Sequence, residues 1–200
     1  MATSLPDMAE QATASRRDQI LEAALRVIGR SGAQAVTHRA VAQEAGVPLG
    51  STTYYFDSKD DLLRQALEHV AATEVDRYRD LGEELREVKS PRELADRLID
   101  KLVAAVEDRT AYIAEYELWL EAGRRPELHE AAQSWCDAEQ RSVAGAMASL
   151  GSEDPATDAS LVVAALDGLG ERILGREDDP AAAAKEFRPE LRRLVERLVG

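Results

Sequence analysis

Apolar residues recur three or four positions apart along most of the chain, and the sequence has no long runs in which apolar and polar residues alternate. A period of about 3.6 residues is typical of an amphipathic helix, whereas alternation would indicate a half-buried strand. Ala, Leu, Glu and Arg, which favour helices, are abundant throughout. The pattern therefore predicts an all-α protein with about nine helices.

Capping and stop signals set the bounds of the expected helices. The strongest start is Ser-Pro-Arg-Glu at residues 90–93, which combines a cap, a proline at the first helical position and a glutamate at the third. A weaker signal at Ser15 predicts that the first helix begins after that residue and ends near Gly29 or Gly32. The other helices are expected at about 37–45, 49–56, 58–81, 110–122, 126–150, 155–174 and 189–199.

Composition limits the class of protein. Of the 200 residues, 44% are hydrophobic and 32% are charged, which is the balance of a soluble globular protein with a buried core. No apolar run approaches the roughly 20 residues that span a bilayer, so no membrane partner is expected. Residues 1–15 lack the features of a signal peptide and are expected to form a flexible tail. Because Cys136 is the single cysteine, no intrachain disulfide can form, and a cytoplasmic location is expected.

The net charge of −13 is unevenly distributed along the chain. Residues 16–59 carry six arginines and lysines against four aspartates and glutamates, which gives this part a net charge of +2. The tail and the long remainder are acidic. A mildly basic N-terminal part joined to a strongly acidic remainder predicts two parts with different partners.

Residues 37–56 have the form of a helix-turn-helix. A helix capped by Thr37 is followed by a turn at Gly46 and by a second short helix ending at Phe56. The residues expected to face inward are Val41, Val47, Thr52 and Phe56. The opposite face of the second helix carries small, hydroxylic and aromatic side chains, which suits entry into a major groove and contact with base edges and phosphates.

This segment, with the Ser-Lys-Asp-Asp-Leu sequence at 58–62, resembles the DNA-binding part of the TetR family of transcriptional regulators. The resemblance covers about residues 16–65. In the remainder, Leu-Asp-Gly-Leu at 166–169 and the helix count are similar to the family's second domain. The family implies a DNA-binding domain at 16–57 and a ligand-binding and dimerisation domain at 58–200. The sequence departs from the family pattern at Pro48, Thr52 and Thr53, and Thr52 is expected to weaken the core locally.

The resemblance also implies which side chains contact DNA. Residues at the start of the first helix of the motif would touch phosphates and a base, and those on the second helix would lie along the groove. Lys59 begins the next helix, whose N-terminus itself favours phosphate. The implied DNA-binding residues are Thr37, His38, Arg39, Leu49, Gly50, Ser51, Thr53, Tyr54, Tyr55 and Lys59. For the aromatic residues, hydrophobic packing is the alternative.

Aromatic and soft side chains gather in the predicted C-terminal domain. Tyr112, Tyr116 and Trp119 share one helix face, and further candidates lie on the neighbouring predicted helices. Such side chains could line a pocket for a small, mostly apolar effector, although ordinary core packing is the alternative for each. The candidate effector-binding residues are Leu98, Leu102, Tyr112, Tyr116, Trp119, Trp135 and Met147.

The last two predicted helices carry apolar stripes that would suit a two-fold, four-helix interface between two copies of the chain. The candidate interface residues are Leu161, Ala165, Leu169, Ile173, Leu191, Leu194 and Leu198. An internal hairpin packed on its own domain is the alternative.

The resemblance to the TetR family implies a ligand-responsive repressor that binds a near-palindromic operator in double-stranded DNA as a homodimer and is released by a small-molecule effector. The sequence has no metalloprotease, nucleophile-elbow, phosphate-loop or dinucleotide-binding motif, so neither an enzyme, a cofactor nor a metal site is expected. The alternative is an all-helical ligand-binding protein or a coregulator without DNA binding.

Overall fold

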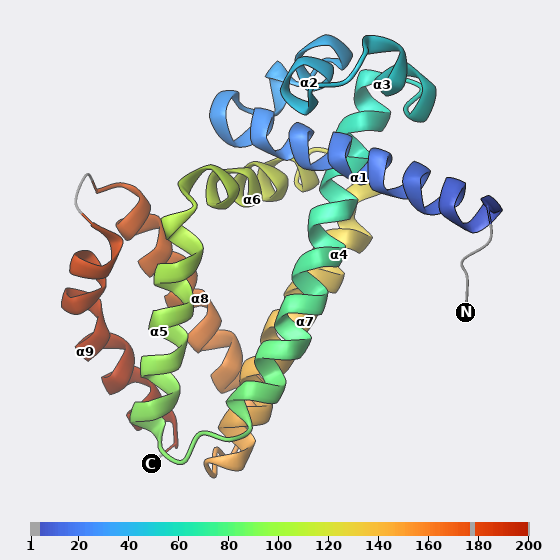
Figure 1. The fold of residues 1–200 in the computed structure, drawn as a ribbon. Coiled ribbons are helices and arrows are strands. Elements are labelled where there is room, and N and C mark those ends of the chain that lie inside the picture. Colours follow the sequence, from blue (N-terminus) through green and yellow to red (C-terminus); the bar gives the residue numbers. More distant parts are fainter. Residues whose placement is uncertain (1–4, 177–178, 200) are drawn as a thin grey trace. The chain divides into compact units, whose positions relative to one another are not determined.

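The computed structural model describes residues 5–176 and 179–199, and within these ranges it contains nine α-helices and no strand (Figure 1). The helices are α1 (Leu5–Ser31), α2 (His38–Ala45), α3 (Leu49–Tyr55), α4 (Lys59–Leu85), α5 (Pro91–Glu107), α6 (Arg109–Ala122), α7 (His129–Ser149), α8 (Pro155–Leu174) and α9 (Pro180–Val199). Two short 3-10 helices, η1 (Ala33–Ala35) and η2 (Pro126–Leu128), complete the described elements. The predicted all-α fold is confirmed.

The chain divides into two compact units. The first contains the residues up to Val70 together with Thr110–Ala131, and the second contains Ala71–Arg109 together with the residues from Ala132 onward. Helix α4 therefore contributes to both units. The first unit holds α6 as well as the predicted helix-turn-helix, so its composition differs from the division after residue 57 that the family implies.

Two of the predicted caps are present. Thr37 Oγ1 accepts a hydrogen bond from the backbone nitrogen of Ala40 at 3.0 Å, and Ser90 Oγ accepts one from that of Glu93 at 3.2 Å. Gly46 ends α2 with a φ of 65°, a left-handed backbone conformation that residues other than glycine rarely adopt. Local signals of this kind act within a few residues, which is why the sequence places these helix ends correctly.

The first helix was expected to begin after a tail ending at Ser15, but α1 begins at Leu5, so this expected start is wrong. Pro6 lies in the first turn, where a helical residue has no intrahelical partner for its N–H and proline is tolerated. The residues that follow include good helix formers such as Ala9 and Glu10, so the helix continues through the cap signal at Ser15. Residues 1–4 lie outside the described ranges.

The last helix also begins earlier than expected, at Pro180 instead of Pro189. A proline is a strong start signal, and both prolines could serve as one. The run of four alanines at 181–184 strongly favours a helix and extends α9 toward its N-terminus. Pro189 is consequently inside the helix, where it lacks the N–H that would donate to the carbonyl one turn earlier.

The first unit is built around apolar side chains of α1, α2 and the start of α4, together with Phe56 directly after α3. Fully buried residues include Ile20, Leu21, Ile28, Val41, Phe56, Leu62, Leu63 and Leu67. Helix α1 also packs closely against the beginning of α6, because a Cβ built on Gly29 would lie 1.9 Å from the carbonyl oxygen of Thr110. Only a glycine allows these two backbones to come so close.

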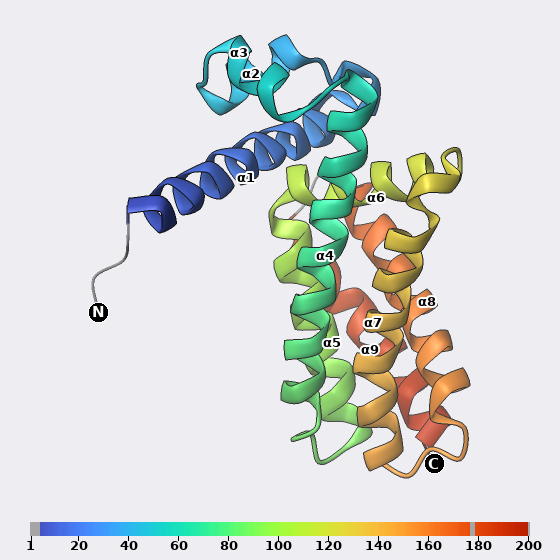
Figure 2. The same ribbon diagram turned by 90° about the vertical axis from the view of Figure 1, so that its right-hand side faces the viewer.

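In the second unit, the C-terminal part of α4 and helices α5, α7, α8 and α9 run alongside one another (Figure 2). A Cβ built on Gly82 would lie 3.2 Å from Ser142 Cα, so α4 and α7 approach closely. Helices α5 and α9 are joined by Asp96, which accepts hydrogen bonds from Arg188 and Arg192 at 2.7 to 3.2 Å. Among the described residues, no helix is long and apolar enough to cross a membrane.

Candidate functional site

The α2–α3 segment forms the predicted helix-turn-helix. Val47 N donates to the carbonyl oxygen of Ala42 at 3.0 Å, which closes the turn after α2. Val41, Val47, Thr52 and Phe56 are all buried, as their inward-facing positions predict. This packing fixes which face of α3 is turned to solvent.

Thr52 is fully buried at the crossing of α2 and α3. Its Oγ1 donates to the carbonyl oxygen of Leu49 at 2.9 Å and lies 3.4 Å from that of His38. Because a buried hydroxyl is costly only when it lacks a hydrogen bond, this threonine is accommodated where the family often has Leu or Ile. The expected local weakening is thus offset by hydrogen bonding within the motif.

The outward face of α3 exposes large side chains. Tyr54 is 79% exposed and Leu49 is 50% exposed, although both are large and hydrophobic. The ring of Tyr54 meets that of Tyr55 edge-on at 5.0 Å. Of the other predicted DNA-binding residues, Thr37, Arg39, Gly50 and Thr53 are exposed, whereas His38, Ser51, Tyr55 and Lys59 are partly exposed. All ten predicted DNA-binding residues are therefore at least partly exposed to solvent.

The basic side chains of the first unit differ in whether they already pair with an acidic residue of the protein. Arg26 Nε lies 2.8 Å from Glu44 Oε1, and Arg30 also pairs with Glu44, so these two guanidinium groups are neutralised within the protein. Their hydrogen bonds hold the pKa of Glu44 below its ordinary value. Arg39 and Lys59 form no ion pair with any described residue, so they retain their charge for an external anion.

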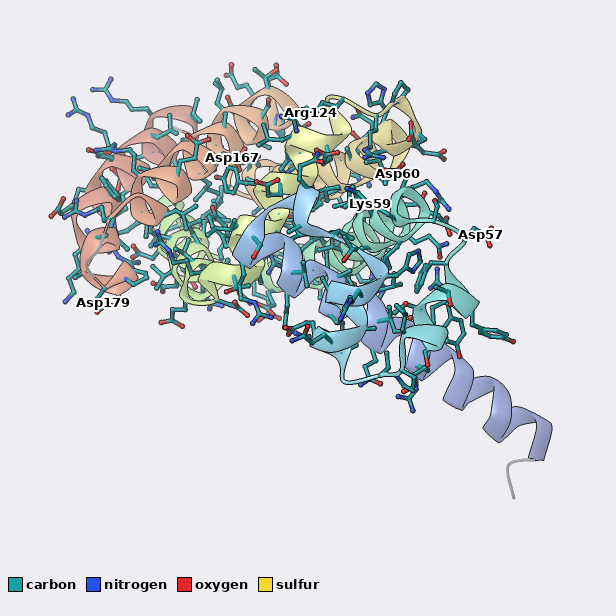
Figure 3. All side chains as sticks on the ribbon, turned by 90° about the horizontal axis from the view of Figure 1, so that it is seen from above. Asp57, Lys59, Asp60, Arg124, Asp167 and Asp179 are labelled. Atoms are coloured by element: carbon teal, nitrogen blue, oxygen red, sulfur yellow. The ribbon has the colours of Figure 1, made fainter. Side chains whose placement is uncertain are left out.

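Lys59 lies at the start of α4, next to Asp60 (Figure 3). Its Nζ lies 3.5 Å from the carbonyl oxygen of Gln34. Asp60 Oδ1 accepts a hydrogen bond from Arg125 at 3.1 Å, and Arg125 also pairs with the buried Glu121 of α6 at 2.8 Å. This chain of contacts ties the first turn of α4 to α6 within the first unit.

The predicted effector-binding residues belong to both units. In the first, the hydroxyl oxygens of Tyr112 and Tyr116 lie 3.5 Å apart, and Trp119 follows on α6. In the second, Leu98, Trp135 and Met147 are buried and Leu102 is partly exposed. Burial alone is compatible with core packing as well as with a pocket wall, so their role in binding stays a prediction.

The second unit contains an acidic cluster that sequence reasoning missed. Tyr78 on α4 donates a hydrogen bond from its hydroxyl to Glu139 Oε1 on α7 at 2.9 Å. Burial, together with the charge of Asp167, raises the pKa of Glu139 to about 7. Glu74, one turn before Tyr78, is itself buried, and this burial raises the pKa of its carboxyl. The only sequence signal was the four-residue spacing of Glu74 and Tyr78, which places both on one helix face.

The predicted interface residues differ in exposure. Leu161 is half exposed, and Ala165, Leu194 and Leu198 are partly exposed. Leu169, Ile173 and Leu191 are buried inside the second unit of a single chain, so their side chains belong to its core. An apolar stripe indicates that one face of a helix is buried against other residues, but it does not show whether those residues belong to the same chain.

Two sequence profiles match the chain. Residues 20–66 match the bacterial regulatory proteins of the tetR family. Residues 89–200, more than half of the chain, match the tetracyclin repressor-like C-terminal domain. The chain belongs to the TetR family. The resemblance predicted from residues 16–65 is confirmed, and the second match extends TetR-family similarity to the C-terminus.

Several solved structures resemble the chain over most of its length. The multidrug binding protein EbrR, complexed with ethidium, is 36% identical over 90% of this chain and 97% of its own, with a TM-score of 0.64. A TetR-family member from Streptomyces coelicolor A3 is 37% identical over 90% and 97%, with a TM-score of 0.65. A protein of Saccharomonospora viridis in complex with choline is 26% identical over 92% and 96%, with a TM-score of 0.73.

The curated relatives match a shorter part of this chain than the solved structures do. The transcriptional regulator PksA of Bacillus subtilis (strain 168) is 35% identical over 104 residues. The nicotine-responsive transcriptional repressor HdnoR of Paenarthrobacter nicotinovorans is 30% identical over 118 residues. These matches cover 52% and 57% of this chain and 48% and 58% of the relatives, so the chain spans about half the length of the curated relatives it matches.

Proposed function

We propose that this protein is a transcriptional repressor that binds a near-palindromic operator as a homodimer and is released by a small organic effector. The observation that carries the proposal is the two-sided character of α3. Its inner face is packed and hydrogen-bonded through Thr52, and its outer face exposes Leu49 and Tyr54. A helix held in this way can enter a major groove without losing contacts in the core.

Contacts with phosphates position such a protein on DNA, and contacts with base edges give it specificity. We assign Arg39, Tyr54 and Lys59 to the phosphate backbone, because the two cations form no ion pair with a described residue and Tyr54 is exposed. Leu49 and Ser51 are assigned to base edges along the groove. We therefore also propose a cytoplasmic location, where a regulator of this kind meets its operator DNA.

The homodimer is proposed on the exposed face of α8. Leu161 is half exposed there, Ala164 is exposed, and a Cβ built on Gly168 would meet nothing within 4 Å. Small residues beside an exposed leucine allow a second helix to approach closely. Leu194 and Leu198 on α9, both partly exposed, extend this surface, whereas the buried Leu169, Ile173 and Leu191 would support it from inside.

A small-molecule effector is supported by the relatives. EbrR is solved with ethidium, proflavin or imidazole, the Saccharomonospora viridis protein is solved with choline, and HdnoR is a nicotine-responsive repressor. Because α4 contributes residues to both units, it is the segment through which an effector could change the DNA-binding state. The ligand can shift that equilibrium only by its difference in affinity for the two states, typically about 1–3 kcal/mol.

The experiment is selection from a pool of random DNA duplexes by the purified protein at two salt concentrations. We expect enrichment of a palindromic sequence whose binding weakens steeply as salt rises, because binding releases counterions from the phosphates. The spacing of the half-sites reports the spacing of the two recognition helices. Absence of enrichment at both salt concentrations, with or without candidate effectors, would favour a coregulator that does not bind DNA.

A further inference from the structure

Glu74 on α4 is a buried carboxylate with incomplete hydrogen bonding. The residue is only 5% exposed, and its Oε2 is buried without a hydrogen-bond donor. Arg77 Nη2 lies 2.6 Å from this oxygen, but off the hydrogen-bonding direction and on a side chain that is half exposed. Burying a charge with one ion pair and an incomplete set of hydrogen bonds is unfavourable, so this carboxylate is suited to receive a further positive group.

The helix register places Glu74 beside other side chains of the acidic cluster. Tyr78 follows Glu74 by one turn on α4 and donates to Glu139 of α7 at 2.9 Å. The close approach of Gly82 to Ser142 holds these two helices together. Trp135, which is buried, precedes Glu139 by one turn of α7. The cluster therefore combines two carboxylates with two aromatic rings.

A third carboxylate belongs to α8. The charges of Asp167 and Glu74 both act on Glu139 and raise its pKa, whereas the charge of Arg77 lowers it. Burial is the largest contribution to the raised pKa of both Glu139 and Glu74. Carboxylates from three helices thus interact through their charges, and Arg77, whose side chain is half exposed, lies within ion-pair distance of Glu74.

The neighbours of these carboxylates indicate which kind of cation would fit. A metal ion requires several oxygen ligands at short distance, and one oxygen of Glu139 already accepts the Tyr78 hydrogen bond. Aromatic faces, in contrast, attract organic ammonium groups and pack against their carbon atoms. A flat or branched organic cation can satisfy the carboxylates and the two rings at the same time.

We propose that Glu74, Glu139 and Asp167, with the rings of Tyr78 and Trp135, form a binding site for an organic cation. The role of this cation as the effector rests on the proposed function, whereas its binding does not. Such a ligand has an apolar or aromatic body and a positive charge, which differs from the mostly apolar effector expected from the sequence.

Calorimetric titration of the full chain with a matched pair of compounds tests the proposal. The cation is 4-(hydroxymethyl)phenyltrimethylammonium, and its neutral isostere is 4-tert-butylbenzyl alcohol, in which carbon replaces the charged nitrogen. Ethidium, followed by fluorescence, serves as a second, polycyclic cation. We expect the cation to bind at least roughly tenfold more tightly than the isostere, and ethidium to bind as well.

Variants assign the binding to the cluster. Glu74→Gln and Glu139→Gln keep the shape of each side chain but remove its charge, and both are expected to abolish the preference for the cation over the isostere. Glu83→Gln is the matched control, because Glu83 is exposed on the same helix. Asp167→Asn, a change at a more exposed position, provides a further variant if either glutamine variant fails to fold.

Each outcome is decisive. Equal affinity for the two isosteres, failure of both cations to bind at millimolar concentration, or a preference that survives in folded Gln variants would overturn the site. Cation binding by a protein that selects no duplex would support the site and reject the proposed function. Cation binding that leaves the complex with selected DNA intact would support the site and reject the effector role.

Discussion

The hydroxyl of Tyr78 on α4 donates a hydrogen bond to Glu139 Oε1 on α7 at 2.9 Å, within the second compact unit. This bond favours the ionised form of Glu139 and lowers its pKa, but burial and the charges of Asp167 and Glu74 act in the opposite direction and prevail. Glu139 therefore carries its proton to a pH near neutrality. This relationship links the acidic cluster to the pH dependence of folding.

The pKa of Glu139 is raised from 4.5 to about 7 in the folded protein. Between these values the folded chain keeps a proton that the unfolded chain releases. The stabilisation is thus complete below pH 4.5 and is lost as the pH rises through 7, by about 3 kcal/mol at most. Denaturant unfolding of wild type and Glu139→Gln from pH 4.5 to 8 measures this pH-dependent part of the free energy of unfolding.

The difference between the two proteins isolates Glu139 from the other titrating groups. Its charged and titratable neighbours include Glu74, Arg77, Tyr78, Cys136 and Asp167. We expect wild type to lose stability relative to the variant as the pH rises. Parallel stability curves for the two proteins would show that the folded-state pKa of Glu139 is near its ordinary value.

Gly29→Ala should destabilise the first unit. Replacing a helical glycine by alanine normally stabilises a helix by about 1 kcal/mol. At this position the new methyl group would lie 1.9 Å from the carbonyl oxygen of Thr110, so α1 or α6 must shift. We expect a net loss of about 1–3 kcal/mol, seen as a lower thermal midpoint.

Gly145→Ala is the matched control for that change. Gly145 lies inside α7, and a Cβ built there would meet nothing within 4 Å. This substitution should raise the thermal midpoint through helix propensity alone. If both variants moved the midpoint in the same direction, the close α1–α6 contact would not be what decides the effect at Gly29.

Replacing both Tyr54 and Lys59 by alanine should weaken binding to every duplex without changing the preferred sequence. Tyr54 is 79% exposed and Lys59 forms no ion pair with a described residue, so little folding free energy is at stake. Loss of a phosphate contact also reduces the salt dependence of binding. Affinities for the selected operator and for an unrelated duplex, measured at two salt concentrations, test this assignment.

Leu49→Ala provides the contrast, because this side chain is assigned to base edges. It should change the sequence selected from a random pool, and leave the salt dependence as it is.

An operator affinity equal to that of wild type in the Tyr54 and Lys59 double variant would remove both residues from the DNA-binding surface.

How far the sequence predicts the structure depends on the range of each interaction. The caps at Thr37 and Ser90 and the turn at Gly46 were predicted because their signals act within a few residues. The starts of α1 and α9 were misplaced because several adequate signals compete, and Pro6 and Pro180 prevail over Ser15 and Pro189. Competition between weak local preferences is settled by the whole helix.

In the candidate sites, too, some features follow from local sequence signals and others do not. The inward positions of Thr52 and Phe56 followed from helix geometry and family resemblance. The contact of Tyr78 with Glu139 joins residues 61 positions apart, and no local pattern specifies such a pairing. For Leu169, an apolar stripe predicted burial correctly but could not say that the cover comes from the same chain.

Leu161→Glu should separate the proposed homodimer into monomers that remain folded. Leu161 on α8 is 50% exposed in the single chain, so a charge there is acceptable in a monomer but not in an apolar interface. Leu120→Glu is a matched control, because Leu120 on α6 is 54% exposed and lies outside α8 and α9. Sedimentation equilibrium should show a dimer dissociation constant raised at least roughly tenfold by the first change and little affected by the second. Equal constants for the two variants would place the interface elsewhere, whereas monomers with wild-type helicity and reduced operator affinity would tie dimerisation through α8 to DNA binding.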